Sequence, residues 1–202
     1  MPNIIRSLLF LVAASLLATN TFAQELAPDV LVKTVSDEVL DIVRQDRDIQ
    51  SGNSGKTMAL IESKVLPRFN FVHMTHLAVA RDWRQANAAQ QQALTEEFRK
   101  LLVHTYSKAL TEYKNQSLEV KPFSMNAGDS DVRVRTEIRK TGGSAPIALN
   151  YYLEKSGAGW KVYDIEVGGV SLVTNYRESF AAEVRSNGID GLIRTLQAKN
   201  KS

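Results

Sequence analysis

The sequence contains no cysteine among its 202 residues, so no disulfide stabilises the fold and no lipid can be attached through a thioether. Long apolar runs are also lacking. The run at residues 8–18 has 11 residues, whereas a helix needs about 20 to cross a bilayer. There is no strongly basic segment either, and the formal net charge is +3. This modest charge argues against a nucleic-acid-binding protein.

The first 23 residues have the pattern of a secretory signal peptide. Arg6 precedes the apolar run, and Thr21 and Ala23 supply the small residues of a cleavage site. We therefore expect residues 1–23 to be removed. The mature chain, residues 24–202, is then a single soluble domain in an exported compartment, which in a bacterium is the periplasm. A retained amphipathic anchor is the alternative.

Hydrophobic spacing divides the chain into a helical part and a strand-rich part. Apolar residues recur every three to four positions at 28–48, 57–66, 69–83 and 88–113, which predicts helices. From residue 118 the period falls to two, which predicts strands at 118–123, 131–140, 147–154 and 160–167. Segments 172–186 and 189–198 close the chain as helices. Short turns imply antiparallel strands, so we expect an α+β fold with a twisted antiparallel sheet of about four strands wrapped by helices.

A serine follows the last predicted strand, in the segment GVSLV at 169–173, which raises the question of a nucleophile. A hydrolase nucleophile elbow has the pattern G-x-S-x-G, and here Val173 stands in the place of the second glycine. No histidine follows Ser171, although the hydrolase order places the histidine last. We interpret Ser171 as a helix cap and expect no catalytic residue and no enzyme activity.

Two histidines, His73 and His76, lie three positions apart and would share one face of a helix. With Asp82 or His104 they could bind a metal, and Asp82 with His76 could act as an acid–base dyad. No cysteine or acidic residue stands at a ligand spacing, so we expect no metal. An exported hydrolase or dehydratase that uses the His73/His76 region remains the alternative.

Positive charge gathers on one predicted strand, where Arg133, Arg135 and Arg139 alternate with apolar residues and therefore share a face. This face is either an ordinary solvated surface that includes Glu137, or a surface that attracts anionic lipid headgroups or an acidic protein. A protein adaptor that holds no ligand is thus a second alternative.

Four segments follow one another along the chain: VLPRFNFVHMTHLAVARDW (65–83), FRKLLVHTYSKALTEY (98–113), GWKVYDIEVGGVSLVTNYRESF (159–180) and GIDGLIRTL (188–196). Together they resemble the MlaC family of periplasmic phospholipid-binding proteins, also called toluene-tolerance or organic-solvent-resistance auxiliary proteins. The resemblance covers essentially the whole predicted mature chain. Two positions depart from the family pattern. Asn70 stands where an acid is usual, and Ala80 stands where a glycine is common.

The resemblance implies a fold similar to the nuclear-transport-factor-like cone, with acyl tails between sheet and helices and the headgroup in solvent. It implies a carrier that shuttles phospholipids between an outer-membrane lipoprotein–porin complex of the MlaA type and an inner-membrane ABC transporter with MCE domains of the MlaD type. Its role would be to maintain outer-membrane lipid asymmetry. We expect a monomer without a cofactor, and phospholipid as the cargo.

Periodicity and the resemblance together select the residues expected to contact the lipid tails. They come from the inward faces of the long helix, the strands, the strand–helix junction and the segment after Pro67: Leu102, Tyr106, Leu110, Val134, Ile138, Leu149, Tyr151, Val170, Leu172, Val173, Phe69, Phe71 and Met74.

Overall fold

The computed structural model describes residues 25–112, 116–140, 142 and 145–201. The predicted signal peptide, residues 1–23, lies outside this range. Within the range, none of the helices combines the length and apolar character that crossing a membrane requires.

The first part of the chain is helical, as predicted. Its elements are α1 (Pro28–Gln45), α2 (Arg47–Gln50), α3 (Ser54–Leu60), η1 (Ile61–Val65), η2 (Leu66–Arg68), α4 (Phe71–Val79), η3 (Ala80–Gln85) and α5 (Ala88–Thr111). Helix α5 begins with a capping box, in which the Asn87 side chain accepts from the Gln90 N–H at 2.9 Å and the Gln90 side chain accepts from the Asn87 N–H at 3.0 Å. These bonds fix the start of the longest helix.

The second part forms an antiparallel sheet, which confirms the α+β class. Its strands are β1 (Gln116–Val120), β2 (Asp131–Lys140), β3 (Ile147–Ser156), β4 (Gly159–Val167) and β5 (Val170–Ser171), and they lie in the order β1-β2-β3-β4-β5. The fifth strand is a two-residue addition to the predicted four. The chain ends with η4 (Thr174–Tyr176) and α6 (Arg177–Lys199), and Gly188 breaks α6 at φ 71° and ψ −179°.

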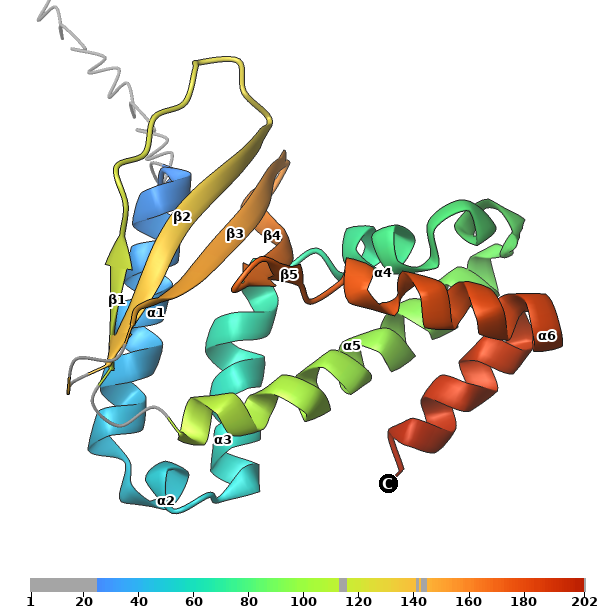
Figure 1. The fold of residues 1–202 in the computed structure, drawn as a ribbon, viewed down its shortest axis with the longest axis horizontal. Coiled ribbons are helices and arrows are strands. Elements are labelled where there is room, and N and C mark those ends of the chain that lie inside the picture. Colours follow the sequence, from blue (N-terminus) through green and yellow to red (C-terminus); the bar gives the residue numbers. More distant parts are fainter. Residues whose placement is uncertain (1–24, 113–115, 141, 143–144, 202) are drawn as a thin grey trace, which may run out of the picture.

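The helices and the sheet share three groups of buried apolar residues. Figure 1 shows α1 lying along the sheet and α5 running from beside α4 and α6 toward α3. The sheet cluster joins α1 to the strands: Leu31, Val32, Val132, Val134, Leu153, Trp160 and Val162. The helical cluster joins α4, α5 and α6: Met74, Ala78, Val79, Ala86, Leu94, Phe98, Leu102, Val173, Phe180, Leu192 and Leu196. The α1–α3 cluster is formed by Val39, Val43, Ile49 and Leu60.

Two predicted helices are interrupted. The segment predicted as one helix at 57–66 changes from α-helix to the wider turn of η1 at Ile61 and then to the tighter turn of η2, which includes Pro67. The segment predicted as one helix at 69–83 ends its α-helical part at Val79, because Ala80 has φ 55° and ψ −126°. A residue with this backbone conformation cannot continue an α-helix.

Asn70 begins α4, and its side chain explains one departure from the family pattern. Its Oδ1 accepts from the His73 N–H at 3.1 Å, which is the cap that an acid also provides. Its Nδ2 donates to Glu154 Oε1 at 2.6 Å, a bond that an acid cannot make. The asparagine therefore keeps the cap and ties α4 to β3.

The conformation of Ala80 generates the first prediction. Among the described residues other than glycine, Ala80 alone has a positive φ. An L side chain is disfavoured there, whereas glycine adopts this region freely. We expect Ala80→Gly to raise the free energy of unfolding by about 1 kcal/mol, measured by urea denaturation.

Ala182→Gly is the matched control, because Ala182 is exposed in the interior of α6. It should lower the free energy of unfolding by about 1 kcal/mol. Equal destabilisation by both substitutions would show that Ala80 is not strained.

Candidate functional site

A cavity of about 290 Å³ lies where the three clusters approach one another. This volume is close to the lower end of ligand-binding pockets, roughly 300–1,000 Å³. Nearly all the side chains that line it are apolar: Leu31, Val32, Val35, Ser36, Val39, Leu40, Ile61, Val65, Leu66, Arg68, Phe69, Phe71, Met74, Leu102, Val103, Tyr106, Ser107, Leu110, Leu118, Leu149, Tyr151, Val162, Ile165 and Leu172. The cavity is thus an apolar compartment with few polar groups.

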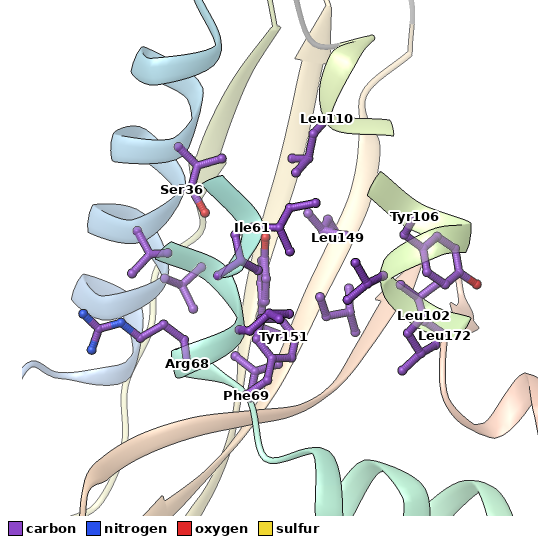
Figure 2. Close-up of a pocket in the computed structure, with 18 of the residues that line it drawn as sticks. Ser36, Ile61, Arg68, Phe69, Leu102, Tyr106, Leu110, Leu149, Tyr151 and Leu172 are labelled. Carbon is purple, nitrogen blue, oxygen red and sulfur yellow. The ribbon is translucent and has the colours of Figure 1, made fainter. Parts of the chain in front are cut away.

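Helical spacing builds two walls of this cavity. In α1, Leu31, Val35 and Val39 follow at intervals of four and therefore lie on one face. In α5, Leu102, Tyr106 and Leu110 follow at the same interval. Figure 2 shows Ser36, Ile61 and Arg68 on one side of the cavity, and Leu102, Tyr106 and Leu172 on the opposite side. Each helix thus turns a regular apolar stripe toward the same space.

The sheet forms a further wall, and a β-bulge shapes it. Leu149 and Tyr151 are two positions apart on β3 and so face the same side. Val162 and Ile165 are three positions apart on β4, which strict alternation would place on opposite faces. The register shifts between the pairs Leu153↔Val162 and Tyr152↔Asp164, which leaves Tyr163 as the extra residue. This bulge brings both Val162 and Ile165 to the cavity.

The structure brings nine of the thirteen predicted contact residues together around the cavity: Phe69, Phe71, Met74, Leu102, Tyr106, Leu110, Leu149, Tyr151 and Leu172. The other four do not line it. Val134 and Val173 are both 0 % exposed, the first in the sheet cluster and the second in the helical cluster. Ile138 is buried and pairs with Leu118 and Ile147 of the neighbouring strands. Val170 is 56 % exposed, two residues from Leu172.

The predicted contact residues include none from α1 or from the segment Ile61 to Arg68, although both line the cavity. The periodicity of Val35 and Val39 marks an amphipathic helix, so the signal for an apolar face was present. It does not show whether that face meets the sheet, another helix or a cavity. No sequence pattern predicts that Arg68 lines the cavity, because a single arginine beside a proline is not part of a periodic apolar pattern.

Two tyrosines contribute rings to the cavity. Burial raises the pKa of the Tyr151 hydroxyl, and the neighbouring Ser36 acts in the opposite direction. Burial, together with the neighbouring Tyr176, raises the pKa of Tyr106 to about 12. The Tyr106 hydroxyl points away from the cavity in Figure 2, so its ring alone faces the interior. Both rings therefore act as apolar wall.

Ser171 accepts hydrogen bonds from free N–H groups, as the sequence predicts, but it does so in the turn before η4. It is not the N-cap residue of a helix, because Val173 is the N-cap of η4 and Tyr176 is the N-cap of α6. Its Oγ accepts from the Thr174 N–H at 2.9 Å and from the Val173 N–H at 3.2 Å. The same hydroxyl donates to Asp164 Oδ2 at 2.6 Å. Asp164 is buried, and burial raises its pKa despite this bond, which acts in the opposite direction. Ser171 thus links β4 to the turn that leads into α6, directly beside Leu172.

The two histidines lie outside the cavity lining and have structural partners. His73 Nδ1 is 2.9 Å from Glu154 Oε2, and its ring stacks on Tyr163 with centroids 4.4 Å apart. The ring of His76 lies 5.8 Å from that of Trp83. Among the described residues there is no cluster of three or more His, Cys, Asp or Glu side chains suited to a metal ion. The arrangement therefore favours a packed pair over a metal site.

Acidic side chains neutralise part of the positive charge on the face of β2 that carries Arg133, Arg135 and Arg139. Arg139 pairs with Glu119 at 2.5 Å and with Glu137 at 3.3 Å. Lys121 bonds the same two carboxylates, at 3.1 and 2.7 Å. Arg133 is paired with Tyr152 across β2 and β3, and this neighbour raises the pKa of Arg133. The face is thus a mixed surface of both charges rather than a continuous positive patch.

Comparison with known proteins assigns the family. The MlaC protein family model matches residues 33–198, which is most of the chain. The chain belongs to the MlaC family. This confirms the resemblance carried by its four sequence segments. A curated relative from Haemophilus influenzae, named an intermembrane phospholipid transport system binding protein MlaC, is 24% identical over 193 residues, covering 95% of this chain and 90% of the relative.

Two further members resemble this MlaC chain. The toluene tolerance protein ttg2D of Pseudomonas putida is 32% identical over 108 residues, which is 53% of this chain and 49% of that protein. A solved structure from Ralstonia solanacearum, described as a phospholipid-binding protein in complex with a phospholipid, superposes with a TM-score of 0.79 at 39% identity. It covers 86% of this chain and 96% of its own. The neighbour thus has the same fold at substantial sequence identity.

The Ser171–Asp164 pair generates the second prediction. Ser171→Ala removes one partner of a buried carboxyl and the acceptor of two N–H groups, so we expect a loss of roughly 1–3 kcal/mol in the free energy of unfolding near neutral pH. Because burial raises the pKa of Asp164 in the folded state above its value in the unfolded state, the free energy of unfolding falls as the pH rises from the unfolded-state pKa to the folded-state pKa. The Ser171 hydroxyl lowers the folded-state pKa of Asp164. Its removal should therefore raise that pKa further and increase the loss of stability between low and neutral pH.

Urea denaturation of both proteins at neutral pH and at a pH below the unfolded-state pKa of aspartate measures the effect. Ser179→Ala is the control, because the exposed Ser179 makes only a local bond to the Tyr176 carbonyl at 2.9 Å. If Ser171→Ala lowers the free energy of unfolding by the same amount at both pH values, the coupling between Ser171 and Asp164 is contradicted.

Proposed function

We propose that this member of the MlaC family is a phospholipid carrier that buries acyl tails in the cavity between its three clusters. The observation that carries the proposal is the cavity itself, because apolar side chains from α1, α5 and the sheet face a shared space. The bound phospholipid of the R. solanacearum neighbour supports the choice of ligand. The nine predicted residues in the lining would contact the tails, and the exposed Val170 would contact lipid only at the surface.

The energetics of burial agree with a carrier. Moving a methylene out of water contributes about 0.8 kcal/mol, so one acyl chain contributes on the order of 10 kcal/mol. A cavity of about 290 Å³ is narrow for such a ligand, so the walls must separate when tails occupy it. Leu31 and Val32 of α1 pack with the strands in the sheet cluster, whereas Leu102 of α5 packs in the helical cluster. We infer that the α5 wall can move away from α1 and the sheet while these two clusters stay packed.

We further propose that residues 1–23 are a cleaved export signal and that the mature protein acts in the periplasm. There it would carry phospholipids between an outer-membrane lipoprotein–porin complex and an inner-membrane MCE-domain ABC transporter. Firm burial makes spontaneous release slow, so a docked partner must favour an opened form. We expect purified inner-membrane complex to accelerate transfer of labelled phospholipid from the protein to vesicles. Equal transfer rates with and without the complex would contradict this step.

A carrier performs no bond-breaking chemistry, and the surroundings of the histidines agree with that. The His73 ring is stacked on Tyr163 and held by Glu154, away from the cavity. The proposal therefore assigns the histidines to packing.

A substitution in the α5 wall tests whether the cavity holds the lipid. Leu110→Glu places a carboxylate in the apolar lining, where its desolvation opposes the presence of a tail. We expect the dissociation constant of the variant for phospholipid to rise at least tenfold, since a cost above roughly 1.4 kcal/mol changes that constant tenfold. We also expect the variant to lose a competition with the wild-type protein for limiting phospholipid by at least this factor. Lipid extraction followed by mass spectrometry measures the bound lipid.

Ala109→Glu is the matched control, because Ala109 is the exposed neighbour of Leu110 in the same helix. It should compete for limiting phospholipid as well as the wild-type protein does. Circular dichroism of both variants separates loss of lipid from loss of fold. A folded Leu110→Glu variant that competes equally with the wild-type protein for limiting phospholipid would refute the assignment of the cavity.

A further inference from the structure

Arg68 differs from every other residue that lines the cavity. Among the described residues that line the cavity, it is the one charged side chain and also the one exposed residue. Because it belongs to the lining and to the surface at once, it marks the boundary between the apolar space and solvent. In Figure 2 its guanidinium extends toward α1, on the side of the cavity opposite Leu102 and Leu172.

The backbone on both sides of Arg68 is firmly held. The Phe69 N–H donates to the Leu66 carbonyl at 3.1 Å, and the Asn70 N–H donates to the Val162 carbonyl of β4 at 2.8 Å. Lys161 Nζ donates to the Pro67 carbonyl. These bonds fix η2 against the edge of the sheet, so the position from which the Arg68 side chain extends is fixed as well.

The guanidinium of Arg68 has no acidic partner among the residues that the structure describes. Two lysines of α1 and η1 differ in this respect, because Lys64 pairs with Glu38 at 2.5 Å and Lys33 pairs with Asp37 at 2.6 Å. An arginine presents a planar fork of donors that matches the oxygens of a carboxylate or phosphate. Arg68 therefore offers an unused anion-binding group at the rim of an apolar cavity.

We propose that Arg68 binds the phosphate group of the phospholipid whose tails fill the cavity. This inference rests on the proposed function. The phosphate would lie at the rim between η2 and α1, where the guanidinium can donate two parallel hydrogen bonds to its oxygens. Every glycerophospholipid carries this phosphate, so Arg68 selects phospholipids over neutral lipids without distinguishing one headgroup from another.

Selective loading tests the role of Arg68. The mature protein, freed of lipid, is incubated with vesicles that contain phosphatidylglycerol and diacylglycerol with identical acyl chains, and the loaded lipids are quantified by mass spectrometry. Arg68→Ala should lower the ratio of phosphatidylglycerol to diacylglycerol on the order of tenfold, the effect of one charge-assisted hydrogen-bonded contact. Arg68→Lys keeps the charge without the fork and should give an intermediate ratio.

Arg185→Ala is the matched control, because Arg185 is an exposed arginine on α6 outside the cavity lining. It should leave the ratio unchanged. An unchanged ratio in Arg68→Ala would overturn the inference, and so would an equal loss of both lipids, which indicates a structural role. Loading of neither lipid by the wild-type protein would instead refute the proposed function itself.

A titration with inorganic phosphate separates the two sources of the anion. The lipid-free protein should show no binding that depends on Arg68, because a free phosphate gains nothing from the apolar cavity. Binding of inorganic phosphate that requires Arg68, without an Arg68-dependent lipid preference, would assign the group to a free anion and overturn the headgroup assignment.

Discussion

Apolar side chains of α1, α5 and the sheet face a shared cavity instead of closing on one another, and the rest of the structure follows from this arrangement. The sheet cluster holds α1 to the strands and the helical cluster holds α5 to α4 and α6, so the protein stays folded around a space that packing does not fill. Protein interiors are normally packed as densely as organic crystals, and an apolar void forfeits contacts on every side. A ligand of matching chemistry regains those contacts, which is why the cavity points to a lipid.

Secondary structure was largely visible in the sequence, because it depends on local spacing. The alternation of apolar residues from Val132 to Ile138 predicts the strand β2, and the apolar residues repeated along one face of α5 predict the longest helix. The elements that the sequence missed depend on single residues. Ala80 interrupts a segment of helical composition by its backbone conformation, and Tyr163 adds a bulge to a strand that otherwise alternates. Hydrophobic periodicity predicts neither the backbone conformation of Ala80 nor the bulge at Tyr163.

The candidate site was predictable in part, for a physical reason. Periodicity shows which side chains face inward, but it does not show whether they meet protein or empty space. Val134 and Tyr151 are paired across β2 and β3 and face the same side. Val134 is covered by α1 residues of the sheet cluster, whereas Tyr151 lines the cavity. That difference depends on where α1 crosses the sheet, which no local pattern encodes.

The segment around Ser171 joins the cavity to the rest of the fold. Its hydroxyl holds Asp164 and two N–H groups, so the turn that carries Leu172 is tied to β4. Arg68 occupies a comparable position on η2, which the Asn70–Val162 bond holds to the same strand. The turn that carries Leu172 and the segment η2 are therefore each tied to β4 by polar contacts.

The central claim, that acyl tails lie between the three clusters, is tested most directly by NMR with a phospholipid that carries a nitroxide on its acyl chain. The account predicts that the methyl signals of Leu102, Leu110 and Leu149 broaden strongly on loading. Broadening confined to exposed residues such as Val72 and Val170 would contradict it, because the tail would then lie on the surface.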